Sequence, residues 1–207
     1  YGILIMAIIN EYHDPHLLYE HLLGLMSSRK FLDMTGSSND IPYYICPFLV
    51  EKTSQMYQHI GQLKNALALK QIKVLDINLY QLCIEHFSTL GVLDRFIADE
   101  TKTPRDVFLK SISGLTDTEE FICPLIIEKI FNETPDIIFI TGVGEVYPYI
   151  RSHKILSTME SKFTEKPLVL FFPGKYETDN LKGSNLTLFG ILDDKYYRAF
   201  NIYHCEP

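Results

Sequence analysis

The sequence predicts an α/β protein in which helices cover both faces of a mostly parallel sheet, a three-layer sandwich closed by an antiparallel β-hairpin. Strand patterns alternate with helix patterns along the 207 residues, as that fold class requires. The runs 136–141 and 167–172 are almost wholly apolar, which is typical of strands buried on both faces of a parallel sheet. Residues 186–192 and 196–203, joined at Asp193-Asp194-Lys195, have the pattern of the closing hairpin.

The first part of the chain predicts two strands and a helix before them. Asp14-Pro15 is a helix-start signal for residues 16–28, because Asp caps a helix and Pro fits its first position. Residues 41–48 predict the first strand, whose two prolines confine regular pairing to its middle. Residues 71–76 lead into the second strand.

An apolar face predicts the helix between these strands, and Thr53 or Ser54 should cap its N-terminus. The apolar residues on that face are Met56, Ile60, Leu63 and Leu67. A third helix is expected over 79–90 and a short one over 92–98. The polar segment 99–105 is the best candidate for a linker.

In the second half, the T-x-x-E pattern at 116–119 predicts a capping box before a helix over 121–131. Pro124 should kink or split that helix. After the strand 136–141 comes a glycine loop, and we expect Pro148 to begin the next helix, which ends near residue 163. Pro173-Gly174 should end the strand that follows.

Composition limits the classes of protein to which this chain can belong. Its net charge of −7 argues against general binding to a phosphate backbone, which needs a basic face. The four cysteines lie far apart without a C-x-x-C pair, so we expect reduced, buried thiols in a cytoplasmic protein. No apolar run is long enough to cross a bilayer. We expect one α/β domain over 1–207, with a remnant or extension at 1–12 and a helical segment at 13–35.

Motifs for cofactors are incomplete. The loop GVGEVY from Gly142 to Tyr147 lacks the third glycine of G-x-G-x-x-G, and Glu145 would repel a pyrophosphate. A Walker A motif would need glycine in place of Val169 and Ser or Thr in place of Tyr176. The three early histidines do not share one helix face, which argues against a metal site. We therefore expect no cofactor and no ATP hydrolysis.

Arg151, Ser152 and His153 fall in the first turns of the helix expected after Pro148. An arginine there opposes the helix dipole, which indicates a specific partner, with Glu145 as a candidate. Neighbours on one helix do not place a serine hydroxyl on an imidazole as a catalytic triad requires. Three interpretations stay open for this group: an internal structural network, a contact with a partner or ligand, and catalysis.

Aromatic residues are frequent near the predicted strand ends. They are Tyr147, Tyr149, Phe172, Tyr176, Tyr196 and Tyr197. Tyrosine is enriched at protein interfaces because it joins a large apolar area to a polar tip. Core packing is the competing explanation for each of them.

Four runs of the sequence resemble the BrxB family of the BREX (bacteriophage exclusion) systems of bacteria and archaea. They are IPYYICPF, ITGVGEVYPYIRSHKIL, PLVLFFPGKYE and LTLFGILDDKYYRAF. MSSRKFLDM, at 26–34, fits as well, so the resemblance spans about 15–203. It implies a P-loop or Rossmann-like α/β fold without Walker A, in agreement with the missing motifs.

The resemblance also implies a place in a multi-protein defence complex. The other subunits include a phosphatase-like PglZ-type protein, a BrxC-type ATPase and a PglX-type DNA methyltransferase, and DNA would be reached through the complex. The family carries no known catalytic residues, so we expect no enzyme. The matched residues are candidates for a partner surface or its scaffold: Gly142, Gly144, Glu145, Tyr147, Pro148, Arg151, Ser152, His153, Pro173, Gly174, Tyr176, Tyr197 and Arg198.

Three functional hypotheses follow. The leading one is a non-catalytic adaptor that docks onto another BREX subunit, the PglZ-type protein first. The alternative is a degenerate nucleotide- or nucleic-acid-binding subunit that uses an anion patch of Arg151, His153, Lys175 and Arg198. The third is a hydrolase that uses His153 and Glu145.

Overall fold

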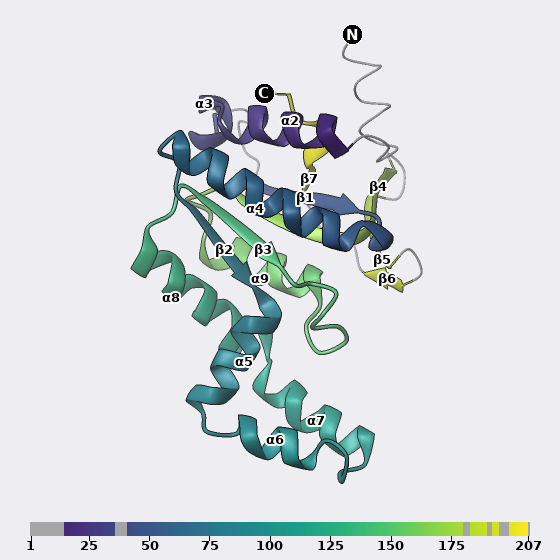
Figure 1. The fold of residues 1–207 in the computed structure, drawn as a ribbon. Helices are drawn as coiled ribbons and strands as arrows, with labels where there is room; N and C mark the ends of the chain where they lie inside the picture. Colours follow the sequence, from purple (N-terminus) through teal and green to yellow (C-terminus); the bar gives the residue numbers. More distant parts are fainter. Residues whose placement is uncertain (1–14, 36–40, 180–182, 190–191, 195–198, 207) are drawn as a thin grey trace.

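The computed structural model describes residues 15–35, 41–179, 183–189, 192–194 and 199–206. Five parallel strands form a sheet in the order β2-β3-β4-β1-β7, with helices on both faces (Figure 1). The strands are β1 (Tyr43–Phe48), β2 (Val74–Asn78), β3 (Ile137–Thr141), β4 (Leu168–Asp179) and β7 (Phe200–Asn201). The α/β class and the mostly parallel sheet between helix layers are confirmed.

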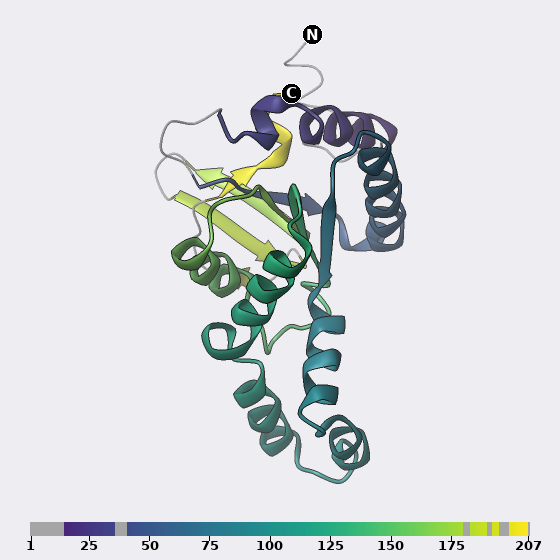
Figure 2. The ribbon, with the colours of Figure 1, turned by 90° about the vertical axis from the view of Figure 1, so that its left-hand side faces the viewer.

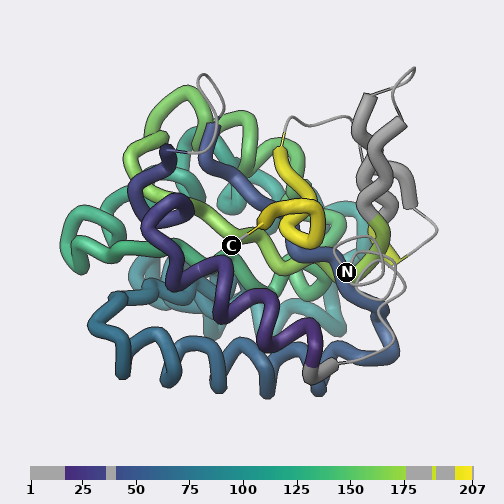
Figure 3. The backbone as a smooth tube through the Cα atoms, turned by 90° about the horizontal axis from the view of Figure 1, so that it is seen from above, coloured from purple at the N-terminus to yellow at the C-terminus, as the bar shows by residue number. Residues whose placement is uncertain are grey.

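Two apolar cores lie on the two faces of this sheet, because side chains alternate along each strand. On β4, Leu168, Leu170 and Phe172 enter one core, and Val169 and Phe171 enter the other. Helices α5 (Leu79–Thr89), α8 (Cys123–Glu133) and α9 (Ser152–Lys162) contribute to the first core. Helices α2 (Pro15–Met26), α3 (Arg29–Leu32) and α4 (Thr53–Leu69) contribute to the second, with α2 alongside α4 (Figure 3). Every residue of β3 is buried, as its apolar run predicted.

Helix α5 leads into a helical projection that extends away from the sheet (Figure 1, Figure 2). It continues through α6 (Leu93–Asp99) and α7 (Arg105–Leu115), neither of which contains a buried residue. Helices over 79–90 and 92–98 were predicted and are confirmed. The segment 99–105, predicted as a linker, connects α6 to α7. Helix α7 was not predicted.

Two predicted helix caps are wrong. The hydroxyl of Thr116 donates to the carbonyl of Ile112, and Asp117 caps the next element by accepting from two backbone N–H groups. That element is the π-helical segment η2 (Thr118–Ile122), which runs into α8. Thr53 is already the first residue of α4, and its hydroxyl donates to the carbonyl of Val50. The N-cap residue of α4 is Lys52, and it makes no side-chain cap hydrogen bond.

Two prolines were predicted to shape helices. Pro124 lies in the first turn of α8, directly after the π-helical segment η2, so the predicted helix over 121–131 changes from π- to α-helical geometry beside this proline. Pro148 does not begin α9. The N–H groups of Tyr149 and Ile150 both donate to the carbonyl of Val146, which closes a separate turn, and α9 begins only at Ser152.

The last strands pair differently from the predicted hairpin. Pro173-Gly174 does not end β4, which continues to Asp179 and pairs antiparallel with β5 (Gly183–Leu188). Strand β5 pairs in turn with β6 (Leu192–Asp194), so Asp193 and Asp194 lie in a strand. Of the predicted second arm, Phe200–Asn201 is β7, which pairs parallel to β1. Residues 195–198 lie outside the described residues.

The thiols of Cys46, Cys83 and Cys123 are free and buried, and that of Cys205 is free and partly buried. Burial raises the pKa of the Cys83 thiol to about 11. Among the described residues, none of the helices combines the length and apolar character that crossing a membrane demands.

Candidate functional site

The carboxyl ends of the parallel strands form the candidate site, because ligands of open α/β sheets bind at this edge. Strand β1 leads into the 3-10 turn η1 (Val50–Lys52), β3 leads into the loop 142–151, and β4 leads into the antiparallel ribbon. These segments enclose a hollow that we call the strand-end crevice. Its lining includes Phe48, Val50, Thr53, Tyr57, Gly142, Gly144, Glu145, Phe171, Pro173 and Phe189.

Tyr57 of α4 holds the glycine loop. Its hydroxyl donates to Oε1 of Glu145 over 2.9 Å and accepts from the N–H of Gly142 over 3.1 Å. Burial and the Glu145 carboxylate raise the pKa of the Tyr57 phenol well above its ordinary value. The phenol therefore stays neutral at physiological pH and keeps the proton that it donates.

Atoms of neighbouring residues lie too close to the two glycines of the loop to leave room for a Cβ. Gly142 has a φ of +74°, and a Cβ there would lie 2.8 Å from Oδ1 of Asn78. That oxygen caps α5 by accepting from the N–H of Gln81. A Cβ on Gly144 would lie 3.0 Å from the Phe189 ring and 3.0 Å from Pro173. Both substitutions would therefore push the loop away from its neighbours.

A polar chain fixes the strands beneath the crevice to helix α4. Oδ1 of Asp76 on β2 accepts from the hydroxyl of Thr141 at the end of β3, over 3.0 Å. Oδ2 of the same carboxylate pairs with Nζ of Lys64 on α4 over 2.8 Å. Asp76 therefore ties two strands and one helix together just before the glycine loop.

Arg151 has a different partner from the one suggested by its position. Its guanidinium carbon lies 4.5 Å from the ring centroid of Tyr147, a cation–π contact, and the Glu145 carboxylate instead takes the Tyr57 hydrogen bond. The Tyr147 ring meets the Phe189 ring edge-on, with 6.3 Å between centroids. Arg151 thus belongs to an aromatic group beside the crevice.

Ser152 and His153 are the first two residues of α9. Ser152 is buried, with 2% of its surface exposed, and His153 is partly buried. Consecutive helix residues point about 100° apart around the axis. This arrangement does not aim the serine hydroxyl and the imidazole at one reacting atom.

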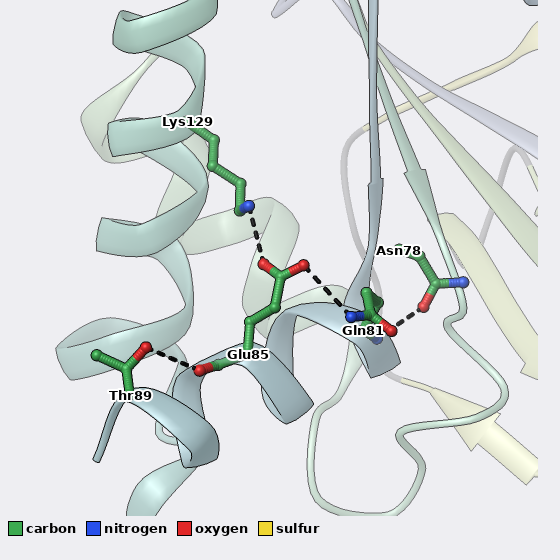
Figure 4. A network of polar contacts seen from close by, with 5 residues as sticks. All are labelled: Asn78, Gln81, Glu85, Thr89 and Lys129. Atoms are coloured by element: carbon green, nitrogen blue, oxygen red, sulfur yellow. Dashed lines mark hydrogen bonds and ion pairs between the residues drawn. The ribbon is translucent and has the colours of Figure 1, made fainter. Parts of the chain in front are cut away.

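A second polar network lies away from the crevice, between α5 and α8 (Figure 4). Glu85 accepts from Nζ of Lys129 over 2.9 Å and from Nε2 of Gln81 over 3.4 Å, and its backbone carbonyl accepts from Thr89. The hydrogen bond from Lys129 lowers the pKa of the Glu85 carboxyl. These contacts join the base of the projection to the helix layer.

The crevice does not suit a phosphate. The Gly142 N–H, which could bind an anion, donates instead to the Tyr57 hydroxyl. The carboxylate of Glu145 lines the same hollow and would repel a phosphate. No group of three or more His, Cys, Asp or Glu side chains among the described residues is arranged to hold a metal ion.

The structure brings some of the predicted site residues together. Gly142, Gly144, Glu145 and Pro173 line the crevice, and Tyr147 and Arg151 lie against its Phe189 wall. Pro148 lies in the loop turn between them, and Gly174 is where β4 leaves the parallel sheet. Lys175 is exposed on β4. The side chains of Tyr176, Tyr196, Tyr197 and Arg198 lie outside the described residues, so the anion patch stays a prediction.

Sequence reasoning missed Tyr57, Asp76 and Phe189. Tyr57 follows the apolar position Met56 on α4, and nothing local marks its hydroxyl as the partner of a loop 85 residues later. Asp76 lies in the middle of a strand pattern, and Phe189 lies in the run predicted as a hairpin arm. Only the tertiary fold identifies these three residues.

Comparison with known proteins identifies the family. The family model described as BREX protein BrxB matches residues 75–202. The BREX protein BrxB of Bacillus cereus (strain H3081.97) is 32% identical over 202 residues, which cover 95% of this chain and 98% of that protein. The BREX protein BrxB of Escherichia coli O9:H4 (strain HS) is 30% identical over 193 residues, covering 91% and 92%. No solved structure gives a significant match. The chain therefore belongs to the BrxB family of BREX proteins, which gives it a place in bacteriophage exclusion.

Proposed function

We propose that this chain is a non-catalytic adaptor of a BREX phage-defence complex and that it docks onto the PglZ-type subunit. The strand-end crevice and the aromatic residues beside it form the docking surface. Membership of the BrxB family supplies the multi-protein context. The hydrogen bonds within the crevice favour protein binding over catalysis at this surface.

The observation that carries the proposal is that the polar groups lining the crevice, apart from Oε2 of Glu145, are bonded within the chain. Tyr57 satisfies both Gly142 and Glu145, and Thr53 donates to the carbonyl of Val50. A catalytic site needs a nucleophile or base aimed at the substrate, together with donors for the charge that develops. A crevice with internally satisfied polar groups and apolar walls is instead typical of a protein contact.

The hydrolase hypothesis has less support from the geometry. It needs Glu145 and His153 to act on one substrate atom. Glu145 accepts a hydrogen bond from Tyr57 of α4, and His153 lies on α9, which follows the separate turn that Val146 closes. Measurable turnover that is lost in His153→Ala, with folding intact, would be required to revive it.

The test is a pull-down of the purified chain against each BREX subunit separately, at low and high salt, with and without DNA. We expect tight, salt-resistant retention of the PglZ-type protein, because apolar contacts are screened little by salt. Retention of the BrxC-type or PglX-type subunit instead would keep the adaptor and replace its partner. Retention of DNA alone, lost at high salt, would overturn the adaptor in favour of the anion patch.

A further inference from the structure

The strand-end crevice contains a cavity of about 220 Å³. Three of its walls are the rings of Phe48, Phe171 and Phe189, from β1, β4 and the turn after β5. An apolar cavity of about 150 Å³ in another protein binds benzene. This cavity therefore has room for one aromatic ring, which can meet the wall rings edge-to-face.

The polar groups around the cavity are not placed to orient a small molecule. The Tyr57 phenol and the Gly142 N–H bind each other, and the Thr53 hydroxyl binds the carbonyl of Val50. Small-ligand sites usually have a volume of about 300–1,000 Å³ and several convergent polar groups that are free to bind. The size and chemistry of this cavity fit a single anchoring side chain of another protein better.

One charge marks the opening of the cavity. Glu145 is the charged residue among the described lining residues, and its side chain is exposed. Its Oε1 accepts from Tyr57, and its Oε2 receives no hydrogen bond or ion pair from any described residue. Val50, 39% exposed, lies at the same opening. A carboxylate that has no cation as a described partner and lies beside an apolar hollow attracts a cation and repels another carboxylate.

We propose that the cavity is an anchor site for one aromatic side chain of the partner, and that Glu145 pairs with a lysine or arginine next to that residue in the partner's sequence. The site would therefore select a short aromatic–basic segment. This inference rests on the proposed adaptor function, which it narrows to one pocket and one kind of segment.

Three capped dipeptides test the chemistry with the full chain and without any partner. Acetyl-Phe-Arg-amide, acetyl-Phe-Glu-amide and acetyl-Ala-Arg-amide are titrated against 15N-labelled protein, and amide shifts at Gly142, Gly144 and Phe189 are followed. We expect the Phe-Arg peptide to bind at least tenfold more tightly than the other two. Equal affinities, or shifts confined to other residues, would overturn the proposal.

Two substitutions separate the apolar contact from the charge. Glu145→Gln should abolish the preference for Phe-Arg over Phe-Glu and leave the preference for Phe-Arg over Ala-Arg. Val50→Trp should block the opening and reduce binding of Phe-Arg at least tenfold. Glu128→Gln on α8 and Val107→Trp on α7 are the matched controls, since both residues are exposed away from the crevice.

The same variants in the subunit pull-down distinguish the two proposals. If the wild-type chain retains a subunit and both Val50→Trp and Glu145→Gln retain it equally, the anchor site is wrong and the adaptor stands. If the wild-type chain retains no protein, the adaptor is wrong, whatever the dipeptides do. Should Val50→Trp fail to fold, Glu145→Gln still decides the charge pairing, and the comparison of Phe-Arg with Ala-Arg on the wild-type chain still decides the aromatic anchor.

Discussion

Tyr57 and Glu145 lie 88 residues apart in the sequence, yet the phenol of one donates to the carboxylate of the other over 2.9 Å. The same phenol accepts from the N–H of Gly142. One side chain on α4 thus fixes both the backbone and the charge of the glycine loop. The conformation of the crevice depends on this contact.

Tyr57→Phe should lower the free energy of unfolding by about 1–3 kcal/mol, because it leaves the buried N–H of Gly142 without its partner. Urea denaturation measures the change. Tyr80→Phe is the control, since Tyr80 is 50% exposed on α5. Loss of the hydroxyl there should change the free energy of unfolding by less than about 0.5 kcal/mol. Equal losses in the two variants would remove the special role of Tyr57.

Gly142→Ala should cost about 2 kcal/mol or more, because alanine is strained at positive φ and its Cβ would press on Asn78. Gly61→Ala tests the same chemical change on α4, where nothing lies within 4 Å of the added Cβ. That control should gain about 0.5–1 kcal/mol from the better helix propensity of alanine. Thermal unfolding of both variants would show opposite shifts, and a stabilised Gly142→Ala would contradict the loop geometry.

Arg151→Ala should impair phage defence more than its loss of stability explains. Removing the contact with Tyr147 should cost about 0.5–1 kcal/mol of stability. Loss of an arginine from an interface centre often lowers affinity about tenfold or more. Phage plating on cells with the complete system, together with protein abundance, measures both effects. Lys154→Ala, exposed on α9, is the control. A folded, equally abundant and fully protective Arg151→Ala would show that the site assignment is wrong.

Glu85→Gln should make stability less dependent on pH. Lys129 lowers the pKa of Glu85 in the folded protein, so the pair stabilises the fold above the ordinary carboxyl pKa and loses this effect as pH falls through the folded-state pKa. The side chains are exposed, so the loss at pH 7 should be only about 0.5 kcal/mol. It should shrink below about pH 4. Chemical denaturation at a series of pH values measures the change, with Glu128→Gln as the control. A loss of stability in Glu85→Gln that persists in acid would exclude the ion pair as its cause.

The sheet was predictable from the sequence because a strand buried on both faces has a continuous apolar run. The runs 136–141 and 167–172 are apolar at nearly every position, and they became the central strands β3 and β4. Helix α4 was predictable for the corresponding reason, since Met56, Ile60, Leu63 and Leu67 are all buried on one face.

Other features were missed or misplaced. Helix α7 has Phe108, Ile112 and Leu115 at helical spacing, and Ile112 and Leu115 pack against the first core, so its sequence contained a helix signal that the prediction overlooked. Thr116 and Asp117 are both capping residue types, and only the fold shows which one caps. Strand β7 is two residues long and pairs with β1, far away in sequence. The loop 142–151 was identified as the candidate site, but the partners of Glu145 and Arg151 depend on tertiary packing.

Strand β4 crosses from the middle of the parallel sheet into the ribbon without a break, since it pairs with β1 and β3 over its first half and with β5 over its second. A pulling force along the ribbon would be transmitted through β4 to the centre of the sheet. It would load the hydrogen bonds that β4 makes with β1 and β3 in shear, so that many of them would have to break together. Traction across the ribbon would open β5 from β4 one bond at a time. The chain is therefore mechanically anisotropic, and a complex that pulls on it would meet the greatest resistance along the axis of β4.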